Sequence, residues 1–477
     1  MPAPAQSHTP AGSAGPSRFG LGDAIVLGLS SSGPAQTLAV SLAALVASCS
    51  FGGPLPVALC FFPMLGIALA YQRLNVWDPR AGATYSWVAR VFHPYLGFLS
   101  GWMILLYYTL GTSSLTIPAG TYTLELVAPA AVNNPLWVAL TGGAWNIAVT
   151  ALALLGLKVA ARFEWLIVVF QYAVLLGLSI VGLFALTGGL TPNPFSWQWF
   201  SLQGMGGMRG LMGGLLVACF MYSGWDAAVY VNEETVDGAR NAGRAAIASV
   251  AILALIYCVA ILGLQAVLLP SDLAAHAGNA LAVISERLLP GPLRILVSLA
   301  VLTGTLATLQ AAVISAARVS LAMARDGVMP RAFARRSPTT GAPWAATLTM
   351  SALNLALLVL VLATGSVSQA LGNVAASLGL LSCLFYGVTG AAALWQHRAQ
   401  LMNSHADFWL GGVLPALGLV FMLWVVIESV HSGATTPTVL AYGAGSVVVG
   451  ALVALLLDRI GRVAFFRAGA SLPTSSS

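Results

Sequence analysis

Long apolar segments follow one another along this chain, separated by short polar stretches. Each is roughly 18 residues or longer, close to the length that an α-helix needs to cross the hydrocarbon core of a bilayer. The segments do not alternate polar and apolar positions as barrel strands do, and in lipid a helix satisfies its backbone groups internally. We therefore expect an all-α integral membrane protein with about twelve transmembrane helices. The predicted spans are Gly22–Ser48, Pro54–Tyr71, Leu96–Ile117, Leu136–Leu157, Phe163–Leu186, Leu211–Val231, Ala245–Leu269, Leu293–Ala317, Trp344–Ala363, Leu371–Trp395, Phe408–Ile427 and Pro437–Leu457.

Two of these spans contain residues that interrupt a helix. The first reads Ser-Ser-Ser-Gly-Pro over 30–34, and the sixth reads Phe-Met-Tyr-Ser-Gly-Trp-Asp over 220–226. Proline lacks an amide donor, and glycine leaves the backbone free to turn. Interruptions five spans apart are typical of an inverted repeat. The alternative is that Gly and Pro are simply common in membrane helices.

The basic residues predict how the spans are oriented. If the N-terminus is cytoplasmic, Arg209, Arg287 and Arg294 lie outside, and the other 17 of the 20 Lys and Arg residues lie inside. Loops rich in Lys and Arg face the cytoplasm. We therefore expect an even number of spans in the cell membrane, with both termini cytoplasmic.

Composition excludes several classes of protein. Only 7% of the residues are charged and 58% are hydrophobic, with a mean hydropathy of +0.87. Soluble domains carry about a quarter charged residues, so a soluble enzyme and a disordered chain are excluded. The net charge of +6 is spread over short loops rather than gathered in a patch, so no nucleic-acid partner is expected.

The sequence contains no motif of a catalytic or metal site. Its single lysine follows Leu157, which excludes a phosphate-binding G-x-x-x-x-G-K-[ST] loop and with it an ATP motor. The six histidines have no metal-ligand spacing, and the five cysteines lie singly in apolar runs. We therefore expect no enzyme activity, no cofactor or metal, and no disulfide partner.

Ionisable residues at membrane depth are candidates for function, because a charge there is costly. Asp226, in the sixth span, either contacts a ligand or accepts hydrogen bonds from amides freed by the break. Lys158, where the fourth span meets the fifth, is either a snorkelling charge that sets topology or a buried ammonium that replaces a bound cation and titrates. The residues alone leave both alternatives open.

A charged segment follows the sixth span. Glu233, Glu234 and Asp237 precede Arg240 and Arg244. The segment is either a cytoplasmic ion-pair network that closes the inner mouth or a solvated loop.

Four stretches carry motifs that occur together in one family. They read Pro-Arg-Ala-Gly-Ala-Thr-Tyr over 79–85 with Gly-Phe-Leu-Ser-Gly-Trp over 97–102, Gly-Leu-Lys over 156–158, Tyr-Ser-Gly-Trp-Asp over 222–226 with Asn-Glu-Glu over 232–234, and Arg-x-x-x-x-Met-Ala-Arg-Asp-Gly-x-x-Pro over 318–330. In these motifs the chain resembles the amino acid–polyamine–organocation (APC) superfamily of secondary transporters, and the last motif is the most specific.

The resemblance implies a fold and a mechanism. A LeuT-like core of five plus five helices would occupy 21–398, with two further helices at 399–460 and cytoplasmic tails at 1–20 and 461–477. The 1–20 tail, rich in Pro, Gly and Ser, is expected to be disordered. Alternating access would act on a central site between the broken helices one and six.

The resemblance also implies roles for individual residues. Substrate would bind at Ser31, Ser32, Gly33, Phe220, Tyr222, Ser223, Gly224 and Asp226, with the first three at its carboxylate. Lys158 would take the place of a sodium ion and couple transport to protons. The residues that would act in gating are Glu233, Glu234, Arg325 and Asp326.

Two departures from the family pattern leave the substrate open. Members often read Gly-Ser-Gly-Ile-Phe in span one, where this chain has Ser-Ser-Gly-Pro-Ala over 31–35, and Asp226 stands where Glu is usual. The expected function is a proton-coupled amino acid or amine permease. The alternatives are a polyamine or organocation importer or exchanger, a non-transporting sensor of the same fold, and a passive channel.

Overall fold

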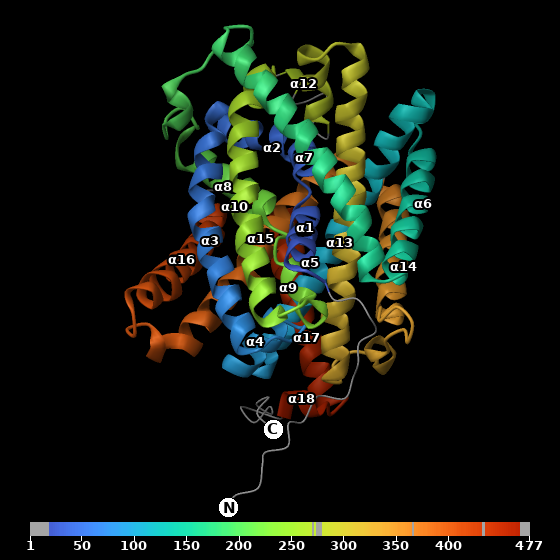
Figure 1. The fold of residues 1–477 in the computed structure, drawn as a ribbon, viewed down its shortest axis with the longest axis vertical. Coiled ribbons are helices and arrows are strands. Elements are labelled where there is room, and N and C mark those ends of the chain that lie inside the picture. The colour runs from blue at the N-terminus through green and yellow to red at the C-terminus, as the bar shows by residue number, and fades with distance from the viewer. Residues whose placement is uncertain (1–18, 270, 273–278, 365–366, 432–434, 468–477) are drawn as a thin grey trace, which may run out of the picture.

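Long helices lie side by side in one bundle, with short helices across its two ends (Figure 1). The computed structural model describes residues 19–269, 271–272, 279–364, 367–431 and 435–467. Within these ranges the side chains of Lys158, 360–364, 367–376, Thr438 and Tyr442 are not described. Most of the expected tails, at 1–18 and 468–477, lie outside the described residues.

The predicted all-helical membrane fold is confirmed. Ten helices of the described chain are long and apolar enough to cross a membrane, counting the two halves of the first span and the two halves of the sixth span as one each. The other two of the twelve predicted spans are α5, with 34 residues, and α14, with 21 residues. At a rise of about 1.5 Å per residue both are long enough to cross the hydrocarbon core.

The first five spans form one half of the core and the next five form the other. The first half is α1 (Leu21–Ser32) with α2 (Pro34–Cys49), α3 (Pro54–Trp77), α5 (Pro94–Val127), α6 (Pro135–Leu154) and α7 (Leu157–Thr187). The second half is α8 (Gly207–Tyr222) with α9 (Ala227–Tyr230), α10 (Gly238–Leu264), α13 (Gly291–Arg325), α14 (Trp344–Thr364) and α15 (Val367–His397). Outside this core lie α16 (Leu414–His431), which continues a π-helical turn (Asp407–Val413), and α17 (Pro437–Arg459).

Contacts between the halves follow a two-fold pattern. Corresponding helices pair with each other, α3 with α10, α5 with α13 and α6 with α14. The last helix of each half packs on the other half in the same way. Helix α7 packs on α10 and α13, and its counterpart α15 packs on α3 and α5. Since each half crosses the membrane an odd number of times, the second half starts on the opposite side and is inverted.

Short helices lie at matching places in the two halves. Helix α4 (Thr84–Val91) connects α3 to α5, and α12 (Ala280–Leu288) precedes α13. Helix α4 lies at the end of the bundle that holds Phe19 and α18 (Ala464–Arg467), which we call the termini face, and α12 lies at the far face (Figure 1). Hydropathy did not predict these helices, because at 8 and 9 residues they are too short to span a bilayer.

Several spans are longer than their apolar segments. Helix α5 continues ten residues past the predicted end at Ile117, and α13 continues eight residues past Ala317. Tyr122 and Arg318 in these extensions are buried against other helices. Tertiary packing therefore extends the helices beyond the part that lipid requires.

The two ends of the bundle differ in charge as the loop analysis predicts. Arg209, Arg287 and Arg294 lie at the far face, in the first turn of α8, in α12 and in the first turn of α13. Arg80, before α4, and Arg325, at the end of α13, lie at the termini face. That the termini face is cytoplasmic stays a prediction.

Candidate functional site

The first span is broken at one residue. Gly33 has φ +45°, in the left-handed region that favours glycine, and separates α1 from α2. Pro34 begins α2 without an amide donor, and no side chain caps that helix start. The break therefore leaves carbonyls at the end of α1 and amides at the start of α2 without partners in their own helices.

Hydroxyl groups bind the carbonyls that the break exposes. Thr308 of α13 donates to the Ser30 carbonyl at 2.8 Å, and Thr37 donates to the Ser32 carbonyl at 2.7 Å. A Cβ at Gly33 would collide with the Thr308 hydroxyl. Gly33 is therefore required by the approach of α13 as well as by its own backbone angle.

The sixth span is broken over four residues, from Ser223 to Asp226, with Gly224 at φ +103°. This break touches the first one. A Cβ on Gly224 would lie 2.9 Å from the Ser31 carbonyl oxygen and 3.1 Å from the Ser32 amide nitrogen. The two interruptions predicted from sequence are thus present and in direct contact.

Asp226 is fully buried in the second break, and tyrosine hydroxyls occupy both of its oxygens. Tyr230 donates to Oδ2 and Tyr386 of α15 donates to Oδ1, each at 2.8 Å. The Tyr386 hydroxyl in turn accepts a hydrogen bond from the Gly224 amide at 3.2 Å. Two tyrosine side chains, one on each side of the carboxylate, thus hold Asp226 in the break.

Aromatic rings enclose this carboxylate. Trp225 stacks on Tyr386 with ring centroids 5.1 Å apart, and Tyr71 of α3 meets Trp225 edge-on at 5.1 Å. Tyr71, Tyr230 and Tyr386 were not identified from the sequence, because a tyrosine inside an apolar run looks like ordinary packing. A buried tyrosine does need a partner for its hydroxyl, and that requirement is the one signal that could have found them.

The other residues predicted to line the pocket lie on α8 and at the start of its break. Ser223 shares a 2.6 Å hydrogen bond with Tyr107 of α5. Tyr222 packs edge-on against Tyr257 of α10 at 5.6 Å, and within the described chain neither hydroxyl has a hydrogen-bond partner. Phe220 is half-buried and lies toward Gly379 of α15.

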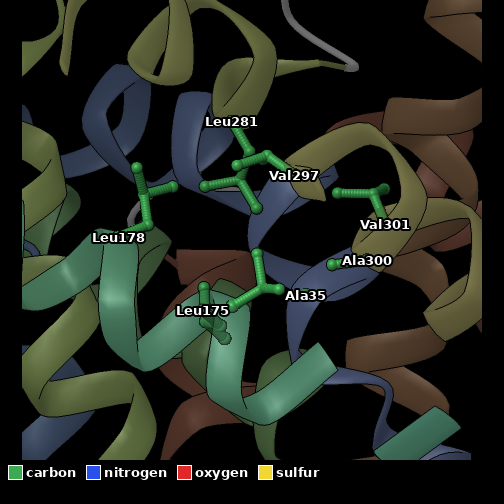
Figure 2. A pocket seen from close by; sticks show the side chains of 8 residues that line it. Ala35, Leu175, Leu178, Leu281, Val297, Ala300 and Val301 are labelled. Carbon is green, nitrogen blue, oxygen red and sulfur yellow. The ribbon is translucent and has the colours of Figure 1, made fainter. Parts of the chain in front are cut away.

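A small apolar hollow lies between the first break and the far face (Figure 2). Its volume is about 10 Å³, room for about one water molecule. The side chains that line it are Ala35, Val174, Leu175, Leu178, Leu281, Val297, Ala300 and Val301. An amino acid does not fit in this hollow.

Glu233 is the centre of an ion-pair network at the termini face. It accepts hydrogen bonds from Arg325 at 2.9 Å, from Arg336 at 3.0 Å and from the Ala81 amide at 3.0 Å. Burial alone would raise the pKa of this carboxyl, but the Ala81 amide and the two guanidinium groups together lower it below its usual value. The network joins the loop before α4, the loop after α9 and the end of α13.

Two further contacts close the same region. Arg318 of α13 makes a bidentate hydrogen bond to Glu234, at 3.0 and 2.9 Å. Tyr85 of α4 donates to Asp326 at 2.8 Å, and burial raises the pKa of Asp326. The arginine partners in the described chain are therefore Arg318, Arg325 and Arg336, rather than the Arg240 and Arg244 considered from sequence.

Three of the four motif stretches thus meet at one place in space. The 79–85, 232–234 and 318–330 stretches all contribute to the network at the termini face. The 156–158 stretch lies at the turn from α6 to α7, where Gly156 has φ +103°. Lys158 is in the first turn of α7, and the position of its side chain lies outside what the structure describes.

Comparison with known proteins gives a consistent result. A sequence model of a family described as amino acid permease matches residues 19–459. The chain is 26% identical over 312 residues to the methylthioribose transporter of Bacillus subtilis, covering 61% of this chain and 64% of that protein, just under two thirds of its length. It is 25% identical to the branched-chain amino acid permease BcaP of Lactococcus lactis, over 75% of this chain and 78% of that protein. It is 28% identical to the low-affinity putrescine importer PlaP of Escherichia coli, over 79% of this chain and 81% of that protein.

Proposed function

The chain belongs to the amino acid permease family, and from this premise we propose that it carries an amino acid or a related amine across the cell membrane by alternating access. Members of this family are transporters rather than enzymes.

One observation carries the proposal, the contact between the two helix breaks. Interrupted helices present amides at the start of a half-helix and carbonyls at the end of one. An α-amino acid has a carboxylate for the first and an ammonium for the second. We assign the carboxylate to the break at Ser31, Ser32 and Gly33, where the uncapped amides are those at the start of α2, and the amine and side chain to the residues from Phe220 to Asp226.

Substrate binding requires the two breaks to move apart. Gly224 lies against the Ser31 carbonyl, so the described conformation is closed at this point. If α1 and α9 moved apart at the termini face, the Glu233–Arg325 network would also break. We assign that network, with Glu234 and Asp326, to the closing of the cytoplasmic mouth.

Amines are the second candidate class, because a buried carboxylate ringed by aromatic side chains suits a cation. Thermal unfolding of the purified protein with L-leucine, putrescine or methylthioribose tests the substrate, since a ligand stabilises the state it binds. Uptake of the stabilising compound into proteoliposomes tests transport. Stabilisation without uptake would favour a sensor, and flux without saturation would favour a channel.

We assign proton coupling to Lys158, as the family resemblance implies. A Lys158→Ala variant should lose uptake driven by a pH gradient while still binding substrate, because the titrating ammonium is gone. Arg162→Ala is the matched control, since Arg162 is exposed one turn further along α7. Undiminished proton-driven uptake by the Lys158 variant would exclude this role.

A further inference from the structure

Glu164 is a buried acid in the bundle that the proposed mechanism does not use. It lies in α7, in a helix long and apolar enough to span the membrane, and its exposed fraction is 1%. Neither of its carboxyl oxygens has a hydrogen-bond partner within the described chain.

The neighbour of this carboxyl is the broken first span. The Ser30 hydroxyl lies beside the Glu164 carboxyl, close enough to interact with it, although the pair does not have the geometry of an ordinary hydrogen bond and the Ser30 hydroxyl has no other partner in the described residues. The Ser30 carbonyl accepts from Thr308. Glu164 therefore lies where α1, α7 and α13 meet, close to the break at Gly33.

A second polar side chain follows on the same face of α7. Gln171, two turns after Glu164, is fully buried, and both of its amide atoms lack partners in the described chain. A Cβ placed on Gly304 of α13 would lie 2.5 Å from the Gln171 Oε1. The same Cβ would lie 3.7 Å from the backbone nitrogen of Gln36 in α2. Unpaired polar groups of α7 thus flank the break of the first span on both sides.

No charged group on the elements packed around α7 pairs with Glu164 in the described chain. On α1, Asp23 accepts from Trp165 and from the Gly20 amide. The other charged or titratable groups on α2, α10, α12 and α13 are Cys49, Arg240, Arg244, Tyr257, Cys258, Glu286, Arg287, Arg294, Arg318 and Arg325, and α7 itself carries Lys158, Arg162 and Tyr172. Three of these arginines make ion pairs, and none of the pairs involves Glu164. Arg287 pairs with Asp272, Arg318 with Glu234 and Arg325 with Glu233.

An ionised carboxylate without partners is strongly disfavoured in such a place, because burial removes its hydration and nothing replaces it. The neutral acid, which carries a proton, is the form that this packing accepts. Water would reach the carboxyl only when α1 moves away from α7 and α13, and hydration favours the ionised form.

We propose that Glu164 is a proton-binding site, protonated while α1 is packed against α7 and α13 and deprotonated when α1 moves away. The step is a simple one, in which a carboxylate takes up one proton as the contact closes and releases it as the contact opens. Because the same segment of α1 contacts the sixth-span break through Ser31 and faces Glu164 through Ser30, substrate release and proton release share one movement. This inference rests on the proposed transport function, and it adds a site to Lys158 without requiring it.

A Glu164→Gln variant tests the site, because the amide has the shape of the protonated acid and cannot titrate. The probe is L-leucine, or putrescine if thermal unfolding selects the amine. Without a membrane potential, a gradient of one pH unit supports about tenfold accumulation for each proton that moves with the substrate. We expect such accumulation in the wild type and in Glu286→Gln, an exposed control on α12. We expect none in Glu164→Gln, which should still exchange substrate across the membrane without a gradient.

The outcomes separate this inference from the transport proposal. If the wild type transports neither probe, the proposed function fails. If the wild type accumulates substrate and Glu164→Gln accumulates it equally, only the role of Glu164 fails. If accumulation follows a sodium gradient instead of a pH gradient, the coupling ion is sodium rather than a proton. That result would overturn the inference.

The native protein provides a second test if the variant does not fold. A hydrophobic carbodiimide reacts with a protonated carboxyl, whose proton moves to nitrogen while its oxygen bonds to the carbodiimide carbon. Peptide mass spectrometry should find Glu164 labelled in membranes near neutral pH, with labelling that declines as the pH rises. Absence of label across that range would contradict a protonated Glu164.

Discussion

At the scale of single residues, the buried carboxylate of Asp226 shows how a break in a membrane helix is held. Two tyrosine hydroxyls donate to it, one from its own half-helix and one from α15. Hydrogen bonds to an ionised group are stronger than those between neutral groups. The Tyr386 hydroxyl also accepts from the Gly224 amide, which the interrupted helix leaves without a helical partner.

Tyr386→Phe is predicted to destabilise the protein more than Tyr230→Phe. Both changes remove one hydrogen bond to Asp226, but only the first also leaves the Gly224 amide unpaired. Each unsatisfied buried group costs about 1–3 kcal/mol. The free energy of unfolding, measured in detergent with denaturant, should fall by this amount for Tyr230→Phe and by more for Tyr386→Phe. Equal losses would mean that the Gly224 bond contributes nothing.

At the scale of the element, the two breaks depend on glycine both for their backbone angles and for their packing. Gly33 and Gly224 both have positive φ, which costs an L-residue free energy. Each also lies against another segment, Gly33 against Thr308 and Gly224 against the Ser31 carbonyl. The breaks are therefore fixed by packing between helices as well as by the local sequence.

Gly33→Ala and Gly224→Ala are predicted to abolish or strongly reduce uptake and to lower thermal stability. The added methyl group is strained by the backbone angle and forces the neighbouring segment away. Gly177→Ala is the control, because Gly177 lies inside α7 with no atom near its Cβ position. That variant should match the wild type or gain up to about 1 kcal/mol, the difference in helix propensity. Normal uptake by the Gly33 and Gly224 variants would contradict a substrate site at the breaks.

At the scale of the whole molecule, the termini face is joined by charges from distant parts of the chain. Arg325 and Arg336 meet Glu233, while Arg318 meets Glu234. These contacts hold the segment after α9, in the second half of the core, against the end of α13 and against the loop that precedes α4. In the proposed alternating access, separation of α1 and α9 at the termini face would break them.

Glu233→Gln is predicted to loosen the termini face without changing how uptake depends on pH between about 5 and 8. The pKa of Glu233 is lowered in the folded protein, so its stabilisation is complete above the ordinary value of 4.5 and is lost as the pH falls through the lowered value. The carboxylate is thus ionised throughout the tested range. Hydrogen exchange of the α1 amides should become faster, because open states gain population.

The matched variant is Glu286→Gln, which removes an exposed carboxylate at the far face and should leave α1 exchange unchanged. If Glu233→Gln instead shifts the pH profile of uptake, this network titrates during transport. Lys158 and Glu164 would then not be sufficient to account for proton coupling.

The sequence by itself determined the membrane class, the helical spans and the positions of both interruptions. These follow from local chemistry, because lipid forces long apolar runs into helices, and Gly and Pro interrupt helices through their own backbones. The motifs also indicated the family. The loop charges further divided the bundle into a strongly basic end and a weakly basic one.

Only the tertiary structure decided which groups meet. Tyr386 reaches Asp226 from 160 residues away, and Arg318 rather than Arg240 binds Glu234. Glu164, buried without a partner in the described chain, could not be recognised from its place in the sequence, near Arg162 at the start of a span. Whether a polar side chain is paired, solvated or isolated depends on helices that pack from elsewhere in the chain, and no local pattern contains that information.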